Sequence, residues 1–424
     1  MSWTNWSEEH HCSPDRMLEP DSEDELQTIV DRYAGERTIR VAGSGHSFSP
    51  VVPTEDILVS LANYTGITTV NPAREQVTVR AGTPLSELTT ALDDYGLALK
   101  NMGDVDAQTI AGALATGTHG TGIELGIMPT QIASVRLIRA DGEIQTIDPD
   151  DGEQFRAVQL SLGTLGIVSE ITLNVRSAYR LRENSWIESL DSVLNRLETL
   201  RANNRHVEFF WFPHTDHTLI KTLNPTSAAP TRGVPYQLDE RAENLAWSAI
   251  CRLSARIPQM SPRLARFAAG TLDGTSTVGP SHDVFPTMRA VRFNEMEYAV
   301  PADAGGSAIR ALRAELRESE WPIVFPIEFR YTRGDDILLS PAYDRDVAFI
   351  AVHAYHRKPY RAYFDACESI FAEHDGRPHW GKMNGRSPTD LRDRFPEFET
   401  FASIRESFDP AGTFLNPELE PLFQ

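Results

Sequence analysis

The stretch GSGHSF, residues 43–48, decides how this chain is interpreted, and it follows directly after a predicted strand over residues 38–42. Successive glycines let backbone N–H groups converge on an anion, so the segment predicts either a phosphate-binding loop or a tight turn between strands. A Rossmann-type loop would run into a helix, which Pro50 and Pro53 forbid here. A Walker A loop is excluded because no Gly-Lys-Ser/Thr sequence follows the glycines.

Two further glycine-rich segments follow along the chain. The segment IAGALATGTHGTG, residues 110–122, has small side chains that let a flat ligand approach the backbone, with nearby hydroxyls on Thr109, Thr116 and Thr118. A closely packed helix end would have the same composition, so both interpretations stay open. The third segment, LGTLGIV at residues 162–168, enters a predicted strand and is weak evidence on its own.

Short strands and helices alternate on both sides of these loops, which predicts an α+β protein. Up to residue 178 the pattern indicates a helix over residues 24–34, a second helix starting at Pro84, and a hairpin at Asp141-Gly142. After residue 180 the expected helices cover residues 189–202, 240–256, 308–318 and 360–373, and the expected strands cover residues 292–298, 323–332 and 348–355. From residue 376 onward, Pro and Gly are frequent and periodicity is weak, which favours a segment wrapped on a surface.

Composition and charge exclude several classes of protein. With 424 residues and 41% hydrophobic content, the chain suits a globular protein of two or three domains. Its formal net charge of -20 argues against binding to nucleic acid, and the lysine shortage fits either codon bias or salt adaptation. We expect no membrane span and no secretory signal, because long apolar runs are absent. Three widely spaced cysteines favour a reducing compartment, so we expect a cytoplasmic protein.

The three loops together resemble the flavin-dependent sugar-lactone and alditol oxidase branch of the vanillyl-alcohol-oxidase superfamily. The resemblance continues into the second half through FPIEFR at residues 325–330, LSPAY at 339–343, HWGK at 379–382 and FLNP at 414–417. It implies a PCMH-type FAD-binding domain of two subdomains at residues 1–178. A substrate cap domain with an antiparallel sheet would span residues 179–375. Residues 376–424 would then form a C-terminal segment that returns to the flavin.

The same resemblance implies how FAD is held. A histidine in the first loop, here His46, would bond covalently to the flavin 8α carbon; the alternative is a histidine that only donates or accepts a hydrogen bond. Gly103 would occupy a position where a larger residue blocks oxygen, which favours an oxidase that produces hydrogen peroxide. The implied cofactor contacts are Val41, Ala42, Gly43, Ser44, Gly45, His46, Ser47, Gly103, Thr109, Gly112, Thr116, Gly117, Thr118, His119, Gly120, Gly166, Ile167 and Val168.

The expected reacting centre starts from Glu328 and Arg330, which are one residue apart on a predicted strand and therefore share a face. From the residues alone, a surface ion pair is the favoured interpretation. The resemblance instead makes them catalytic together with Lys382. A base would take a hydroxyl proton as hydride leaves for flavin N5, while the two cations stabilise the developing charge. The expected substrate-binding residues are Asp104, His353 and Tyr355.

The implied substrate is a sugar-1,4-lactone of the L-gulono or D-arabinono type, with molecular oxygen as the electron acceptor. Alditol oxidases often have a serine at the position of Asp104. This difference argues against an open-chain polyol as the substrate and favours a lactone. An alditol or aldose oxidase, or a lactone dehydrogenase with another acceptor, remains an alternative, as does a non-catalytic flavin-binding module. A metal hydrolase is disfavoured, because His214 and His217 lack the accompanying carboxylate pattern, and we expect no metal.

Overall fold

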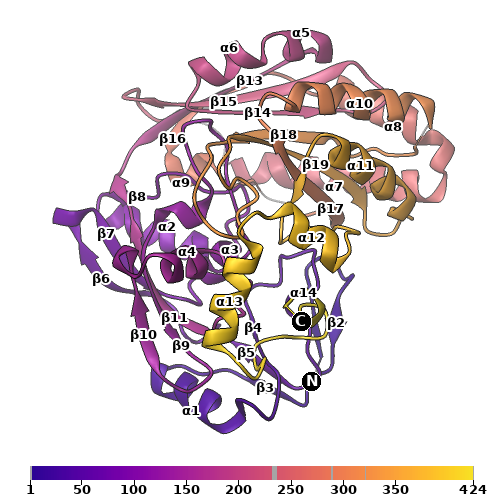
Figure 1. Ribbon diagram of the computed structural model, residues 1–424. Coiled ribbons are helices and arrows are strands. Elements are labelled where there is room, and N and C mark those ends of the chain that lie inside the picture. The colour runs from indigo at the N-terminus through magenta and orange to yellow at the C-terminus, as the bar shows by residue number, and fades with distance from the viewer. Residues whose placement is uncertain (1, 232–235, 288–289, 320, 424) are drawn as a thin grey trace.

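The structure is a computed structural model that describes residues 2–231, 236–287, 290–319 and 321–423. Figure 1 shows a lower lobe, built from the N-terminal half and the C-terminal segment, beneath an upper lobe that forms the cap. Among the described residues, no helix combines the length and the apolar character that crossing a membrane requires.

The first subdomain of the lower lobe is built on a three-stranded parallel sheet. The strands run in the order β3 (Arg16–Leu18), β5 (Ile57–Ser60) and β4 (Ile39–Ala42). Helix α1 (Glu23–Tyr33) begins at Ser22, whose side chain accepts a hydrogen bond from the Glu25 N–H. The apolar face of α1 packs on this sheet, so strand β4 is held rigidly where the first glycine loop leaves it. A small pair, β1 (Trp3–Thr4) and β2 (His11–Cys12), lies beside that loop.

The second subdomain is a five-stranded antiparallel sheet. Its strand order is β10 (Ile144–Ile147), β9 (Ile132–Ile138), β11 (Ile167–Asn174), β7 (Gln76–Arg80) and β6 (Ile67–Asn71). The hairpin between β9 and β10 turns at Gly142 with φ +79°, as the Asp-Gly pair predicts. Three helices complete this subdomain: α2 (Leu85–Asp94), α3 (Ile110–Ala115) and α4 (Glu153–Gln159). A short pair, β8 (Leu97–Ala98) and β12 (Arg176–Ser177), precedes the cap.

The cap is an eight-stranded sheet whose two faces differ. Apolar side chains of one face pack under α5 (Leu190–Asn195), α6 (Leu197–Asn203), α10 (Gly305–Glu318) and α11 (Arg361–Glu373). The other face carries charged side chains and is turned toward the lower lobe (Figure 1). The strand order is β16 (Ser276–Pro280), β13 (Arg180–Ser189), β15 (His217–Thr226), β14 (His206–Trp211), β18 (Ile327–Thr332), β19 (Val347–Tyr355), β17 (Phe293–Pro301) and β20 (Arg377–Pro378).

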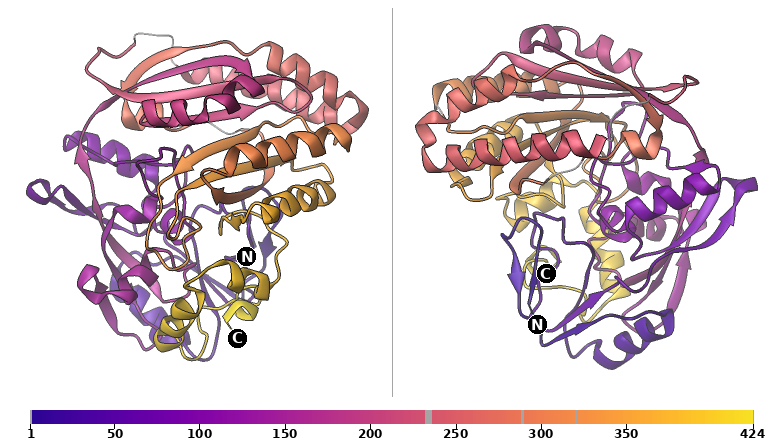
Figure 2. Two further views of the ribbon diagram at one scale, coloured as in Figure 1. Left: turned by 45° about the horizontal axis from the view of Figure 1, so that its top comes forward. Right: turned by 180° about the vertical axis from the view of Figure 1, so that it is seen from behind.

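Several boundaries differ from the sequence-based expectation. The helix expected over residues 189–202 divides at Arg196 into α5 and α6. The strand expected from residue 323 begins only at Ile327. A helical hairpin, α7 (Tyr236–Arg256) and α8 (Ser261–Gly270), packs against the edge of the cap (Figure 2).

The C-terminal segment is more helical than its composition predicts. It contains α12 (Pro388–Arg394), α13 (Phe398–Phe408) and α14 (Glu420–Phe423). Its Asn416 side chain donates to the carbonyls of Pro50 and Pro53, both at 2.9 Å. The Phe48 N–H donates to the Gly381 carbonyl at 2.8 Å, so the segment also contacts the end of the first glycine loop.

Candidate active site

The first glycine loop is held open by its surroundings. A Cβ atom on Gly43 would lie 2.4 Å from Thr109 Oγ1, and Gly45 has φ +73°, so both positions need glycine. The Trp6 N–H donates to the Gly45 carbonyl at 2.8 Å and fixes the loop from the N-terminal side. Within the described part of the chain, the backbone N–H groups of residues 44–47 donate no hydrogen bond. They are therefore available to an anion.

The three glycine-rich segments, far apart in sequence, line one elongated cavity. Residues 41–47 form one wall, and residues 111, 112, 115 and 116 with residues 161–163, 166 and 168 form the others. A Cβ on Gly166 would lie 2.4 Å from the Ile138 carbonyl, so this wall also requires glycine. Open backbone donors in the middle and close-packed glycines on the walls fit an elongated dinucleotide with a pyrophosphate, which is the shape of FAD.

Arg40, which the sequence analysis missed, ties the first and third loops together. It is 3% exposed, and its guanidinium donates to the carbonyls of Val51, Leu162, Gly163 and Phe414. Burial lowers its pKa to about 10. Because one side chain joins segments more than 100 residues apart, it fixes the width of the cavity at this end.

The cavity continues into a second one toward the cap. The two share His46, Ser47, Gln108 and Thr116. The second is lined on one side by residues 103–105 and 116, 118 and 119, and on the other by Glu295, Glu297, Arg330, His379 and Lys382. The charged face of the cap sheet is therefore the end wall of the cavity that the glycine loops begin.

Arg330 is enclosed by three carboxylates. Its Nε lies 3.0 Å from Glu208 Oε2, its Nη2 lies 3.3 Å from Asp104 Oδ1, and it forms an ion pair with Glu328. Burial opposes its charge, but Glu328, Asp104 and Glu208 raise its pKa well above the ordinary value. Arg330 is therefore a permanent cation in the cavity wall. Glu208 lies opposite Arg330 on neighbouring strand β14, a register that the sequence could not reveal.

Lys382 is held by two carboxylates of strand β17. Its Nζ lies 2.6 Å from Glu295 Oε2 and 4.0 Å from Glu297 Oε2, and 5.2 Å above the ring of Phe48. Burial opposes the charges, yet Lys382 and His353 lower the pKa of Glu295 to about 2, and the carboxylates raise the pKa of Lys382. The pair is fully ionised at neutral pH. The sequence analysis missed both glutamates, although their i, i+2 spacing was visible.

His353 connects the two charged networks. Its Nδ1 lies 3.0 Å from the Pro326 carbonyl, which can only accept, so this nitrogen carries a proton. Its Nε2 lies 3.5 Å from Glu295 Oε1 and 4.0 Å from Glu328 Oε2. The ring therefore bridges the carboxylates that accompany Lys382 and Arg330.

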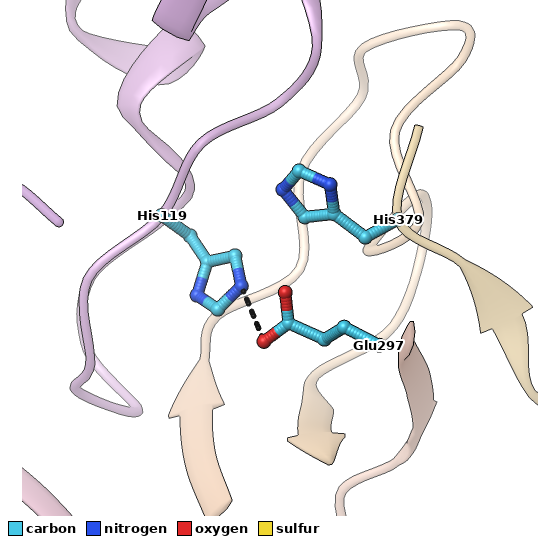
Figure 3. Close-up of side chains that lie close together, drawn as sticks. All are labelled: His119, Glu297 and His379. Atoms are coloured by element: carbon cyan, nitrogen blue, oxygen red, sulfur yellow. Dashed lines mark ion pairs between the residues drawn. The ribbon is translucent and has the colours of Figure 1, made fainter. Parts of the chain in front are cut away.

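A second histidine holds a proton against Glu297. His119 Nδ1 lies 2.8 Å from the Gly120 carbonyl, and its Nε2 lies 3.2 Å from Glu297 Oε1 (Figure 3). Both neighbours are acceptors when Glu297 is ionised, so only the doubly protonated ring satisfies them. Burial opposes the Glu297 charge, but His119 and Lys382 together lower its pKa. His119 Nε2 therefore keeps the proton that faces the ionised Glu297 carboxylate in the cavity wall.

His379 completes this cluster without becoming a metal ligand. Figure 3 shows the Glu297 carboxylate pointing between the rings of His119 and His379. The Gly381 N–H donates to His379 Nδ1 at 2.9 Å, which places the proton of the neutral ring on Nε2. Burial lowers the pKa of His379 to about 3, so the ring stays neutral. In this tautomer Nε2 has no lone pair for a metal ion, and the interaction within the cluster is the ion pair between His119 and Glu297.

His46 lies where the two cavities meet. Its ring stacks on Trp6 with centroids 5.7 Å apart. Burial, followed by repulsion from Lys382, lowers its pKa, so the imidazole is neutral and keeps a nitrogen lone pair at neutral pH.

Most of the expected site residues line these cavities, and six do not. Glu328 and His353 instead contact the lining residues Arg330 and Glu295. Tyr355 packs in an aromatic cluster with Phe293 and Phe325 instead of lining the cavity. It is the last residue of strand β19 and lies beyond the charged residues around Arg330 and Lys382. Ile167 is buried in the core of the first subdomain. Gly117 and Gly120 act through packing, since a Cβ there would lie 2.9 Å from Leu160 and 2.3 Å from the Met102 carbonyl.

Comparison with known proteins gives consistent matches. Residues 171–422 match the family model described as D-arabinono-1,4-lactone oxidase, and residues 14–148 match the model described as an FAD binding domain. The chain is 38% identical to L-gulono-1,4-lactone dehydrogenase of Mycobacterium tuberculosis, covering 98% of this chain and 97% of that protein. It is 30% identical to L-gulonolactone oxidase of Mus musculus, covering 100% and 98%.

Solved structures agree on the fold. A protein described as a solvent-stable cholesterol oxidase superposes with a TM-score of 0.86 at 20% identity, covering 100% of this chain and 97% of that one. At this identity the similarity concerns the fold alone. The expected α+β class with a PCMH-type FAD-binding domain and the expected family are confirmed, whereas the roles of individual residues stay predictions.

Proposed function

The chain belongs to the D-arabinono-1,4-lactone oxidase family and has an FAD-binding domain, and we propose that it oxidises a ring hydroxyl of a sugar-1,4-lactone. The observation that carries this proposal is the charged wall built by Arg330 and Lys382 at the end of the cavity that the glycine loops begin. Relatives named for L-gulono- and D-arabinono-lactones support these substrates over alditols. A flavin-binding module without catalysis would have no use for two cations held by five carboxylates in the cavity wall.

The residues that would hold FAD are those of the elongated cavity. The N–H groups of residues 44–47 would donate to the pyrophosphate. Glycine at positions 43, 112 and 166 lets Thr109 and the Ile138 carbonyl pack closely against these segments and so fixes the cavity wall. When bound, FAD accepts a hydride at N5 from the carbon that bears the reacting hydroxyl. We propose that His46 attaches it covalently, supported by the neutral ring at the meeting point of the two cavities.

The chain's own groups would handle the substrate hydroxyls and the proton. Arg330 and Lys382 stabilise negative charge on the reacting oxygen, because the surrounding carboxylates raise the pKa of both and keep them cationic in the cavity wall. Glu328 is assigned as the acceptor of the hydroxyl proton, and Asp104 and His353 bind neighbouring hydroxyls. Glu328 and His353 pair with the lining residues Arg330 and Glu295, whereas Tyr355 packs in an apolar cluster and has no part in this assignment.

Molecular oxygen is the proposed electron acceptor, and hydrogen peroxide the proposed second product. This rests on Gly103, where an added Cβ would lie 3.1 Å from Thr118 Cγ2 and would narrow the space beside the cavity. A dehydrogenase with another acceptor is the alternative that the name of the mycobacterial relative favours. We also place the protein in the cytoplasm, in line with its three free cysteines.

The test is anaerobic reduction of the purified flavoprotein by a panel of candidate substrates. L-gulono-1,4-lactone and D-arabinono-1,4-lactone should bleach the flavin, and xylitol should do so at least about tenfold more slowly. Rapid bleaching by xylitol alone would replace the lactone with an alditol. Readmitting oxygen then assays peroxide, and stoichiometric peroxide is the result that the oxidase proposal requires.

A further inference from the structure

A row of alternating charges crosses neighbouring strands of the cap sheet and ends at Arg330. Lys221 on β15 lies directly opposite Glu208 on β14, and Glu208 lies directly opposite Arg330 on β18 (Figure 1). Residues directly opposite each other in an antiparallel pair point to the same face of the sheet. That face is the one turned toward the lower lobe, because Leu223, two residues after Lys221, packs in the core with side chains of that lobe.

Glu208 divides its two carboxylate oxygens between the two cations of this row. Its Oε2 lies 3.0 Å from Arg330 Nε, and its Oε1 lies 3.6 Å from Lys221 Nζ. Glu183 on β13 completes the row, since its Oε2 lies 3.1 Å from Lys221 Nζ. None of the four side chains is more than 15% exposed, so water weakens these contacts less than it would weaken ion pairs on the surface.

The contact with Glu208 determines which atoms of Arg330 face the site. Because Nε is bound by Glu208, the Nη2 end of the guanidinium reaches Glu328 and, at 3.3 Å, Asp104. The guanidinium is planar, so a fixed Nε also fixes the direction of both Nη groups. Of the four residues in the row, only Arg330 lines the second cavity. Lys221 therefore contacts the site only through Glu208.

The charge of Lys221 has a consequence for Arg330, which carboxylates attract from two sides. Without Lys221, the full charge of Glu208 would draw the guanidinium toward β14 and away from the two carboxylates beside the cavity. With Lys221 in place, Glu208 is neutralised from the side away from the cavity and still accepts the hydrogen bond from Nε. Lys221 thus offsets an attraction that would otherwise displace Arg330.

We propose that Lys221 is a positioning residue, which acts through Glu208 to hold Arg330 where its guanidinium stabilises the charge that develops on the substrate oxygen. This inference rests on the proposed lactone oxidation. A lactone is uncharged before it reacts, and the oxygen becomes negative only as the proton and the hydride leave. Lys221 should therefore affect the rate of hydride transfer much more than the affinity for the lactone.

The experiment is anaerobic stopped-flow reduction of the holoenzyme over a range of L-gulono-1,4-lactone concentrations, which gives the limiting rate and the dissociation constant separately. Lys221→Met should lower the limiting rate about tenfold and leave the dissociation constant within about twofold. Lys221→Arg should recover most of the rate. Lys100→Met removes the same charge from an exposed position of the lower lobe and should match the wild type.

The double variant Lys221→Met/Glu208→Gln distinguishes positioning from a purely structural role. A glutamine oxygen can still accept the hydrogen bond from Arg330 Nε, and the charge that Lys221→Met leaves uncompensated is gone. The double variant should therefore be reduced faster than Lys221→Met. If the row served stability alone, removing a second member would add to the loss in urea unfolding and recover no rate. A double variant that is no faster than Lys221→Met would overturn the proposal.

A crystal structure of the Lys221→Met holoenzyme tests the positioning without turnover, and Lys221→Gln takes its place if Lys221→Met does not fold. Arg330 should keep its contact with Glu208 and lose the one with Asp104. An unmoved Arg330, or a wild-type limiting rate in the variant, would overturn the proposal. A wild-type protein that no lactone bleaches would instead contradict the proposed function, and the position of Arg330 would still decide this inference.

Discussion

At the scale of single residues, the buried ion pair between His119 and Glu297 leads to a prediction about stability. His119→Gln should lower the free energy of unfolding by about 3 kcal/mol, because it leaves a buried carboxylate without its imidazolium partner. Glu297→Gln should also destabilise, and the double variant should recover part of the loss because neither charge is then left alone. Urea unfolding of all four proteins measures the coupling. Strictly additive losses would show that the two side chains do not stabilise each other.

A second expectation at this scale concerns His46. In the wild-type protein the flavin should stay with the pellet after acid precipitation, and in His46→Ala it should move to the supernatant. Ser44→Ala, which leaves the imidazole in place, is the matched control. Flavin that leaves the wild-type protein in acid would make His46 a non-covalent neighbour.

Part of the site could be predicted from the sequence and part could not, for a physical reason. Glu328 and Arg330 are two residues apart on one strand, so their shared face follows from the pleat alone. Glu208 and Arg40 act on partners that are distant in the sequence, and only strand register and loop packing bring them there. Tyr355 shows that the alternation of side chains along a strand does not by itself place a residue in the site. It shares a face with His353 but lies beyond the end of the cavity.

At the scale of elements, Arg40 is expected to join strand β4 to the first and third glycine loops. Arg40→Lys should cost about 3 kcal/mol or more and should lower the flavin content of the purified protein several-fold, because an ammonium cannot reach four separate carbonyls. Arg37→Lys is the control, since Arg37 makes only exposed ion pairs with Asp15 and Asp56. Equal flavin content in both variants would contradict this role.

The attachment of the hairpin formed by α7 and α8 to the cap should depend on pH. Lys358 Nζ donates to Ser254 at 2.8 Å and Ser261 at 3.2 Å, and burial lowers its pKa to about 8 from about 10.5. Between these values the unfolded chain binds more protons than the folded one, so the free energy of unfolding should rise as pH increases from about 8 to about 10.5. Lys358→Met should remove this rise. A wild-type slope that the variant retains would assign it to other groups.

The elements themselves were only partly predictable. The Asp-Gly hairpin and α1 appear as expected, because local turn chemistry and helix periodicity determine them. The C-terminal helices were missed, since their stability comes from burying Phe398, Phe401 and Phe408 against the lower lobe and not from strong local signals. The helix expected over residues 189–202 divides at Arg196, whose φ of -119° and ψ of 9° depart from helical values.

At the scale of the whole molecule, the cap sheet separates two environments. Its outer face is apolar and covered by helices, and its inner face is turned toward the lower lobe (Figure 2). That inner face supplies Glu295, Glu297 and Arg330 to the cavity, and Lys382 joins them from the segment that follows the sheet. Each lobe supplies half of the cavity, so neither half of the sequence could specify it alone. The resemblance of the loops nevertheless predicted the pairing of an FAD-binding domain with a cap, and the family matches confirm it.

The most direct test of the central claim is the rate of anaerobic flavin reduction by L-gulono-1,4-lactone, measured by stopped flow in the wild type and three variants. Glu328→Gln and Lys382→Met should keep their flavin and slow its reduction well over tenfold, a loss of more than about 1.4 kcal/mol of transition-state stabilisation. Glu170→Gln, on a strand of the lower lobe outside the cavity, should match the wild type. Wild-type rates in both Glu328→Gln and Lys382→Met would remove the charged wall from the reaction and contradict the account.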